Sequence, residues 1–507
     1  MKSASSLSFR ATLIALFLVV TIVRGAADAT WVDFRAGNGT GLPGNPFDNL
    51  SNALRAASSR GNIICKPGSS ETSITINQSV TISSDGGAVV VGIGLPQPVK
   101  QYNFVTHNWE PFFSFGYYIE EDTCYTEPGH SIPWGLLEAS RANTIVAVDM
   151  KREYDSCIQS VLAGAQARGL KVVLGINRAL ISSVASGDPN AYAPLREFVQ
   201  SYGGHPALLG WLLGDENDTK HDNEPFLEPQ TVSAAAVLIH SWDEYHQIWQ
   251  VFSGLCPDPI YPTQLCPYGT SGPGHGPILP YLGGTDVVLT DQYSEAPNVS
   301  TFGGADRTLK YVWHGRDFVG KGRAWGVVTQ GIGTDVNNPL PYRLPYKEEF
   351  RWNVLSALAA GRARTIQAWM LPSPLEKYYS TPAIIESFLT NSVAPVYVEL
   401  GKIKHGMETG YSVGQVSVSS TTAGYQMPSA LLLYDSISRK YYLIVANVGT
   451  LPLSVTITLS SLPIGPLAPT ADRYGSSVPV TPINGGLYRL ESSLTNHEAV
   501  IYSISVQ

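Results

Sequence analysis

Short apolar runs alternate with segments of helical periodicity between residues 105 and 372. The apolar runs have the length and composition of strands that are buried on both faces. In chain order they are Phe112–Tyr118, Thr144–Met150, Lys171–Asn177, Leu208–Glu216, Gln247–Ser253, Val287–Tyr293, Ala324–Gln330 and Arg364–Met370. Helices are predicted between most of them, at Ser131–Arg141, Tyr154–Arg168, Ala193–Tyr202, Gln230–Tyr245, Arg307–Val319 and Lys347–Arg362. Eight βα units over about 270 residues predict an α/β fold, a (β/α)8 TIM barrel.

An open, doubly wound α/β sheet is the alternative fold for the same alternation. Such a sheet usually carries a glycine-rich phosphate-binding turn after its first strand, and none follows residue 118. The chain has no P-loop and no dinucleotide-binding fingerprint elsewhere. The sequence therefore favours the barrel and gives no reason to expect a cofactor.

The segments on either side of the barrel have a different pattern. Residues 47–57 have helical spacing, and short β-rich runs such as Val89–Val91 follow them. After residue 393, turn residues separate runs with strand-type alternation, which predicts a small antiparallel β-sandwich. The sequence thus predicts a leader (1–28), a small β-rich module (29–98), the barrel (99–392) and the β-sandwich (393–507).

The N-terminus has the features of a secretory signal peptide. Lys2 and Arg10 precede an apolar run from Ala11 to Val23, which small residues follow. We therefore expect a secreted, extracellular protein with no membrane anchor after cleavage. A net charge of -8 and the lack of a basic run argue against nucleic acid or an acidic membrane as partner. Hydrophobic residues make up 44% of the chain, which is enough for a large core. We expect the protein to be a monomer.

Secretion affects the interpretation of the five cysteines. Cys256 and Cys266 bracket a loop rich in proline and tyrosine, so a disulfide between them is plausible. A bond between Cys124 and Cys157 is a weaker inference. Cys65 lies in an apolar run and is expected to be a buried free thiol. No CxxC motif or Cys/His cluster indicates a metal site.

Five Asn-x-Ser/Thr sequons fit a glycoprotein. They begin at Asn38, Asn49, Asn77, Asn217 and Asn298. Asn217 directly follows the acidic pair described next, where a glycan would crowd an active site. We expect that sequon to be unused.

The fourth predicted strand ends in two adjacent carboxylates, Asp215 and Glu216. Catalytic groups of a parallel-strand barrel lie at the C-terminal ends of its strands. A pair of acids at such an end is the usual means of breaking a glycosidic bond. The alternative is that both side chains only cap the next helix or contact solvent.

The residues around this pair resemble a large clan of (β/α)8 glycoside hydrolases. In that clan the pattern HPA…GW…NE ends strand four with the acid/base glutamate. Here His205-Pro206-Ala207, Trp211 and Glu216 match, and Asp215 replaces the asparagine. The resemblance implies that Glu216 donates a proton to the leaving oxygen, and it extends to the C-terminal β-sandwich. Separately, "NPFDNLSNALRAA" followed by a strand and "KPG" resembles one rung of a pectate-lyase-like β-helix.

Other strand ends supply candidate pocket residues. Trp369 ends the eighth strand, where the clan often places an aromatic residue under the sugar, and Tyr293 ends the sixth. Aromatic rings stack on the apolar faces of sugars. Asp149 and Asn177 end the second and third strands and are expected to line the same pocket.

The seventh strand departs from the clan. The clan's nucleophile is a glutamate there, whereas this strand ends in Gln330, whose amide cannot attack an anomeric carbon. One explanation is that the second carboxylate comes from another strand, with Asp291 the first candidate and Asp149 the next. Another is substrate-assisted cleavage by Asp215 and Glu216 together, similar to the acid pair of hexosaminidases.

A third explanation is that the barrel has lost hydrolysis and only binds glycans, and unrelated barrel chemistry is a fourth. The leading hypothesis is a secreted glycoside hydrolase that acts on a polysaccharide or glycan with Glu216 as general acid. The alternative is a non-catalytic carbohydrate-binding or extracellular-matrix protein. The position of a second carboxylate relative to Glu216 discriminates between them.

Overall fold

A computed structural model gives the structure of the chain. It describes residues 29–33, 39–57, 61–66, 68–70, 79–85, 89–91, 97–119, 132–217, 227–252, 279–292, 323–330, 344–369, 382–409, 415–420, 428–449, 451–460, 462, 466–483 and 486–507. Two compact units, residues 1–95 and 96–507, are described separately below.

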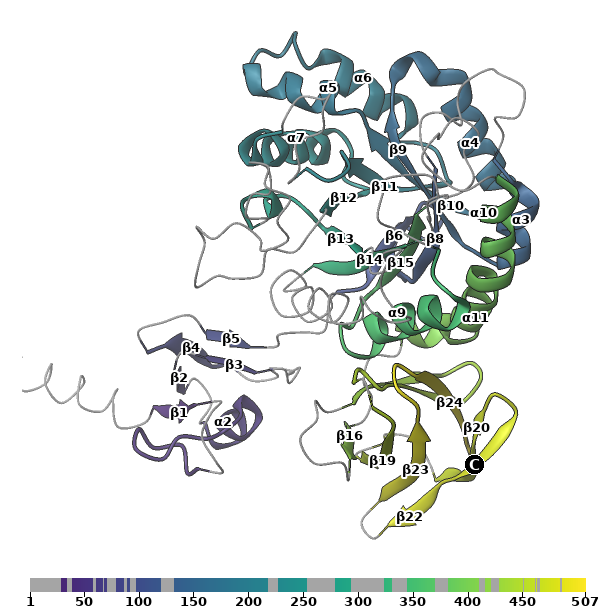
Figure 1. Cartoon of the computed structure of the whole chain (residues 1–507). Helices are drawn as coiled ribbons and strands as arrows, with labels where there is room; N and C mark the ends of the chain where they lie inside the picture. The colour runs from purple at the N-terminus through teal and green to yellow at the C-terminus, as the bar shows by residue number, and fades with distance from the viewer. Residues whose placement is uncertain are drawn as a thin grey trace, which may run out of the picture. The chain divides into compact units, whose positions relative to one another are not determined.

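Eight parallel strands close into a barrel, as predicted (Figure 1). They are β8 (Ser114–Ile119), β9 (Thr144–Met150), β10 (Lys171–Ile176), β11 (Leu208–Leu213), β12 (Gln247–Phe252), β13 (Val287–Gln292), β14 (Ala324–Gln330) and β15 (Thr365–Trp369). Each strand pairs with the next in the chain, and β15 pairs with β8, with Thr365 opposite Ser114. The barrel is therefore closed, and the open-sheet alternative is wrong.

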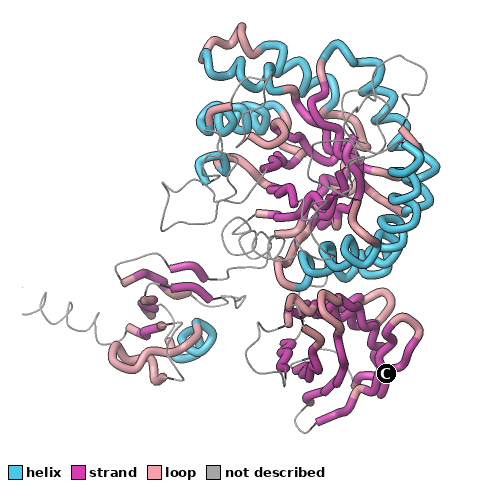
Figure 2. Tube along the Cα trace, in the orientation of Figure 1, coloured by secondary structure: helices cyan, strands magenta, loops and turns pink. Residues whose placement is uncertain are grey.

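Helices form an outer ring around the strands (Figure 2). They include α3 (Trp134–Ser140), α4 (Asp155–Ala167), α5 (Arg178–Ser182), α6 (Ala193–Tyr202), α7 (Pro229–Trp242), α9 (Lys347–Ala359), α10 (Pro382–Phe388) and α11 (Ala394–Thr409). The predicted helix at 307–319 lies outside the described residues. Residue 393, where the barrel was expected to end, lies in a continuous helical stretch between α10 and α11.

Apolar side chains fill both faces of the barrel strands. One buried cluster occupies the barrel interior and includes Tyr118, Val146, Val173, Leu212, Trp249, Val251, Leu289, Val328 and Trp369. A larger cluster packs the outer faces of the strands against the helices. This two-sided burial explains why the strands read as continuous apolar runs rather than as alternating ones.

An antiparallel hairpin, which the sequence pattern did not predict, precedes the barrel. Its strands are β6 (Val99–Asn103) and β7 (Asn108–Phe112), so the predicted first strand at 112–118 begins two residues later than expected. The Lys100 N–H donates to Oε1 of Gln247, the first residue of β12, over 2.7 Å. Val99 belongs to the interior cluster. The hairpin therefore covers the N-terminal end of the barrel, opposite the end where the strands finish.

The C-terminal β-sandwich has two antiparallel sheets. One contains β16 (Gln415–Ser420), β19 (Leu453–Ser460), β23 (Leu487–Leu494) and β22 (Thr481–Ile483). The other contains β17 (Ser429–Asp435), β18 (Lys440–Ala446), β24 (Ala499–Val506), β20 (Leu467–Arg473) and β21 (Ser476–Pro479). The inward residues of both sheets form one buried cluster, as sandwich packing requires.

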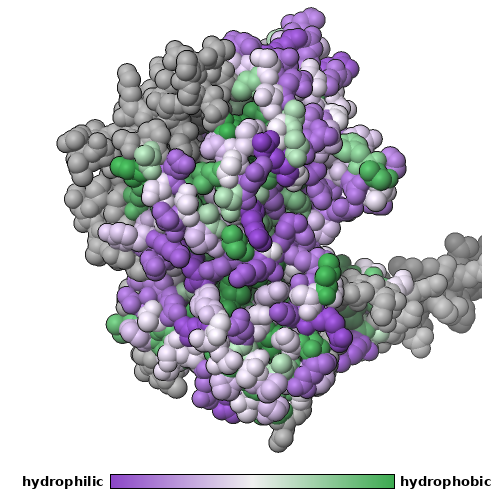
Figure 3. All heavy atoms as spheres, turned by 90° about the vertical axis from the view of Figure 1, so that its right-hand side faces the viewer, coloured by the Kyte–Doolittle hydropathy of each residue, from purple (hydrophilic) through white to green (hydrophobic). Residues whose placement is uncertain are grey.

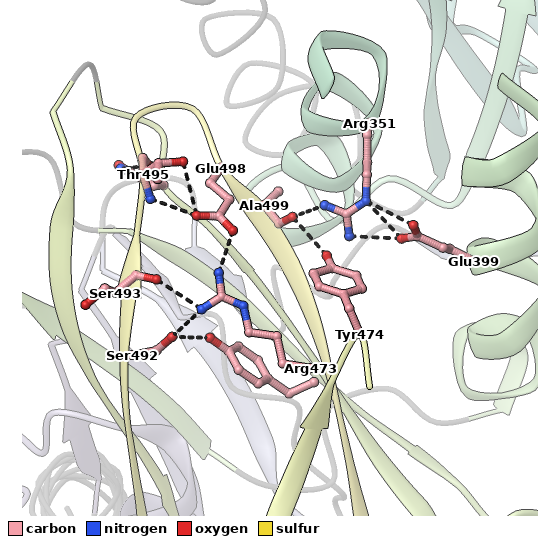
Figure 4. Close-up of polar contacts among 11 residues, drawn as sticks. Arg351, Glu399, Arg473, Tyr474, Ser492, Ser493, Thr495, Glu498 and Ala499 are labelled. Atoms are coloured by element: carbon pink, nitrogen blue, oxygen red, sulfur yellow. Dashed lines mark hydrogen bonds and ion pairs between the residues drawn. The ribbon is translucent and has the colours of Figure 1, made fainter. Parts of the chain in front are cut away.

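The Arg351 side chain links the sandwich to the barrel helices (Figure 4). Arg351 of α9 makes a two-pronged ion pair with Glu399 of α11, with Nη2 2.9 Å from Oε2, and also donates to the backbone oxygen of Ala499 in β24. Within the sandwich, Arg473 pairs with Glu498, the residue before Ala499. The barrel and sandwich thus share a polar junction that is largely shielded from solvent.

The N-terminal unit contains parallel strands. β1 (Thr30–Val32), β2 (Asn62–Cys65) and β4 (Thr81–Ser84) form one sheet, and β3 (Gly68–Ser70) pairs with β5 (Val89–Val91). Helix α2 (Leu50–Ala56) is capped at its start by Asn49, whose side chain accepts from the Asn52 N–H over 2.8 Å. Cys65 is buried and free, as predicted, and burial raises the pKa of its thiol. The likeness to a β-helix rung stays a prediction.

Cys157 is disulfide-bonded. Cys124, Cys256 and Cys266 lie outside the described residues, so the pairings proposed for them stay predictions. The face of the protein in Figure 3 is mostly hydrophilic, with hydrophobic residues scattered over it. Among the described residues, no helix is long and apolar enough to cross a membrane.

Candidate active site

The acidic pair lies on a sharply bent segment directly after β11. Gly214 and Glu216 both have left-handed backbone conformations, with φ of 69° and 47°. For a residue with a side chain this conformation costs roughly 1–2 kcal/mol. A Cβ on Gly214 would lie 2.6 Å from Asn217 Oδ1, so only glycine fits there. The strain at Glu216 persists because surrounding groups fix the segment.

Two buried side chains hold this segment. Arg178, the first residue of α5, is 1% exposed, and its Nη2 donates to the backbone oxygens of Asp215 and Glu216, the latter over 2.9 Å. Asn217 is fully buried; its Nδ2 donates to the Leu213 oxygen and, over 3.2 Å, to Gln250 Oε1 of β12. An Nδ2 atom engaged in this way has no room for a glycan in the folded protein.

Three carboxylates act on one buried hydroxyl. Tyr118 of β8 lies in the barrel interior and is fully buried. Burial, followed by the negative charges of Asp215, Asp291 and Glu216, raises the pKa of its hydroxyl well above its usual range. The acids that follow β11 and the acid near the end of β13 thus share the electrostatic environment of one hydroxyl. Tyr118 therefore stays protonated and is able to donate a hydrogen bond.

Asp291 is the one of these acids that β13 supplies. It alternates along the strand with Val287 and Leu289, which both belong to the interior cluster, so it lies on the inner face near the C-terminal end. Its side chain is buried. That Asp291 accompanies the acidic pair stays a prediction.

Asp149 lies on a β-bulge near the end of β9. The pairing of β9 with β10 shifts at this point, because Leu174 lies opposite Ala147 but Ile176 lies opposite Met150. Asp149 has a φ of 50° and is half-buried. A Cβ on Gly175 would lie 2.5 Å from the Ala147 oxygen, so the bulge depends on glycine in β10. Bulges next to active sites commonly redirect a side chain.

The remaining predicted pocket residues do not all lie in the barrel interior. Trp369 ends β15 in the barrel interior, with its ring 5.2 Å from that of Tyr118. Asn177 follows β10, but its Oδ1 accepts from the Ala179 N–H over 2.9 Å and thereby caps α5. Gln330 ends β14 and pairs in register with Trp369. Tyr293 and the side chain of Gln330 lie outside the described residues.

Sequence reasoning missed Arg178 and Tyr118. Tyr118 was inside a predicted strand, but two adjacent tyrosines left open which one faces inward. Arg178 acts through backbone oxygens, which leave no sequence signal. Within the described part of the chain, no group of three or more His, Cys, Asp and Glu side chains is arranged to hold a metal ion.

Comparisons with known proteins find similarity in structure but not in sequence. No protein-family model and no curated protein matches the chain. A family 5 glycoside hydrolase from Bacteroides vulgatus matches with 12% identity and a TM-score of 0.49, over 80% of this chain and 93% of that one. A family 51 α-L-arabinofuranosidase from Bifidobacterium longum matches with 13% identity and a TM-score of 0.47, over 81% and 97%.

An endo-β-1,4-mannanase from Thermotoga petrophila matches with 11% identity and a TM-score of 0.40, over 78% of this chain and 98% of that one. At identities and TM-scores this low, the likeness carries no argument about the activity of this chain. The closed barrel itself is established by its strand pairing.

Proposed function

We propose that the protein is a secreted glycoside hydrolase that cleaves a polysaccharide or glycan, with Glu216 as general acid. The observation that supports this proposal is that Asp215 and Glu216 directly follow β11, that Asp291 lies near the end of β13, and that the charges of all three act on the Tyr118 hydroxyl in the barrel. Hydrolysis of a glycosidic bond needs two carboxyl groups, one to protonate the leaving oxygen and one to act at the anomeric carbon or on water.

Asp291 is the second carboxylate in this proposal. Gln330 at the end of β14 cannot serve as a nucleophile, since an amide can only donate or accept hydrogen bonds. Asp291 would accept a proton from water as that water attacks the anomeric carbon, and Glu216 would protonate the departing oxygen. This pair of roles predicts inversion of anomeric configuration. Proton NMR of the first-formed sugar tests it, and retention would count against Asp291 as base.

The central test replaces Glu216 with glutamine. E216Q keeps the size and a hydrogen-bonding group but removes the transferable proton. It should lower kcat on natural glycans by about 10²–10⁴-fold, the usual contribution of a positioned general acid. The loss should be much smaller on aryl glycosides with acidic leaving groups, which need little protonation.

Glu228, an exposed residue at the start of α7, provides the matched control. E228Q makes the same chemical change at an exposed residue and should leave kcat unchanged. A wild-type protein that binds glycans but hydrolyses none of a broad panel would instead support the carbohydrate-binding alternative. The specific observation behind that alternative is glutamine at the end of the seventh strand.

A further inference from the structure

We propose that Arg178 is a positioning residue for the general acid: it sets the backbone from which the Asp215 and Glu216 side chains project. This inference rests on the proposed function. Nη2 of Arg178 donates to two successive backbone oxygens, those of Asp215 and Glu216. A single cation that binds two neighbouring carbonyl groups fixes the orientation of both peptide planes.

The start of α5 and its neighbouring contacts hold the Arg178 side chain in place. It begins α5 immediately after Asn177, whose side chain caps the same helix. Its aliphatic part passes close to Gly214, since a Cβ built there would lie 3.5 Å from Arg178 Cγ. The guanidinium is buried, so water does not compete for the two carbonyl groups.

The segment needs such a constraint because its conformation is intrinsically unfavourable. Glu216 has a φ of 47°, which most residues with a side chain avoid. Without the bridge between the two carbonyl groups, Glu216 would relax to a right-handed or extended conformation. Its Cα–Cβ bond would then point elsewhere, and the carboxyl group would no longer meet the leaving oxygen. Asn217 fixes the other end of the segment through Leu213 and Gln250.

The test compares Arg178→Lys with Glu216→Gln. Lysine keeps the positive charge but not the forked, planar donor. If Arg178 acts through Glu216, R178K should lower kcat on natural glycans by about 10²-fold, with KM nearly unchanged, and much less on activated aryl glycosides. The R178K/E216Q double variant should be no slower than E216Q, because both changes remove the same function.

Arg364 supplies a matched control. It is also buried and donates to a backbone oxygen, that of Met407, but it precedes β15 and so lies at the opposite end of the barrel. R364K should leave kcat and its leaving-group dependence unchanged. Equal losses by R178K on natural and activated substrates would show a merely structural role and overturn the proposal.

Amide hydrogen exchange tests the same idea without relying on activity. Peptides that cover residues 208–217 should exchange faster in R178K than in wild type, whereas barrel peptides elsewhere should not. Unchanged exchange at 214–217 would overturn the proposal even if activity fell. If wild type hydrolyses no glycan but R178K loosens only this segment, the proposed function fails and the positioning of the acidic pair stands. Should R178K fold poorly, R178Q, which keeps an amide donor, repeats both measurements.

Discussion

Two adjacent tyrosines of the first barrel strand lie in different surroundings. Tyr117 and Tyr118 are adjacent and both buried, but Tyr117 belongs to the outer cluster and Tyr118 to the barrel interior. The Tyr118 hydroxyl lies in the field of three carboxylates and has no hydrogen-bond partner among the described residues. It is therefore available to a neighbouring carboxylate.

We predict that Tyr118→Phe lowers kcat/KM by roughly tenfold or more, as expected for the loss of one hydrogen bond to a charged or reacting group. The ring that packs on Trp369 stays, so the melting temperature should change little. Steady-state kinetics and thermal unfolding measure the two effects. Y117F removes a hydroxyl from the outer face and should leave kcat/KM unaltered; equal effects of both variants would contradict the assignment.

The candidate site shows which residues a sequence can reveal. Asp215 and Glu216 could be found because an apolar run ended abruptly in charge, and Asp291 because it ended another such run. Tyr118 and Arg178 could not, because their roles depend on which way a strand faces and on backbone oxygens. Asn177 was predicted to bind substrate from its position alone, whereas its Oδ1 caps a helix.

At the scale of elements, the bulge in β9 depends on the neighbouring strand. We predict that Gly175→Ala destabilises the protein and lowers activity, because the new methyl group would meet the Ala147 oxygen and the Asp149 nitrogen at 2.5 and 2.9 Å. β9 would have to move, and Asp149 with it. Overpacking of this kind costs typically 1–3 kcal/mol.

Urea unfolding with parallel kinetics tests the bulge prediction. Gly169→Ala is a useful comparison, since Gly169 also lies next to β10 but a Cβ there meets open space. Its φ of 67° still penalises alanine, so G169A should lose stability without losing activity. If G175A retained full activity per folded molecule, the bulge would have no role in the site.

Most elements followed from hydrophobic periodicity, and the exceptions have physical reasons. β9 and β14 have the predicted bounds, and the residues on either side of β9, Asn143 and Lys151, are only half-buried. The β6–β7 hairpin was missed because its strands mix charged, polar and aromatic residues, with only Val99 and Phe112 buried. The sandwich was predicted as a class, but its short strand β22 (Thr481–Ile483) has no clear alternation.

At the scale of the whole molecule, Arg351 supplies polar contacts at the junction between barrel and sandwich. We predict that Arg351→Met lowers the free energy of unfolding by about 1–3 kcal/mol, because it leaves Glu399 and the Ala499 oxygen without this donor. Denaturant unfolding measures the loss. R152M breaks an exposed pair with Glu197 and should cost almost nothing. A similar loss in both variants would mean that burial at the junction adds no stability.

The pairing of β15 with β8 also has a consequence for synthesis. Gln367 of β15 donates to Ser114 of β8, and the two residues are 253 positions apart in the chain. At about 5–20 residues per second, a ribosome needs roughly 13–50 s to make that stretch. Throughout this time the first barrel strand has one edge without its final neighbour. Such an edge can pair with other nascent chains. The strand order therefore requires that the incomplete barrel be protected from such pairing until its last strand has been synthesised.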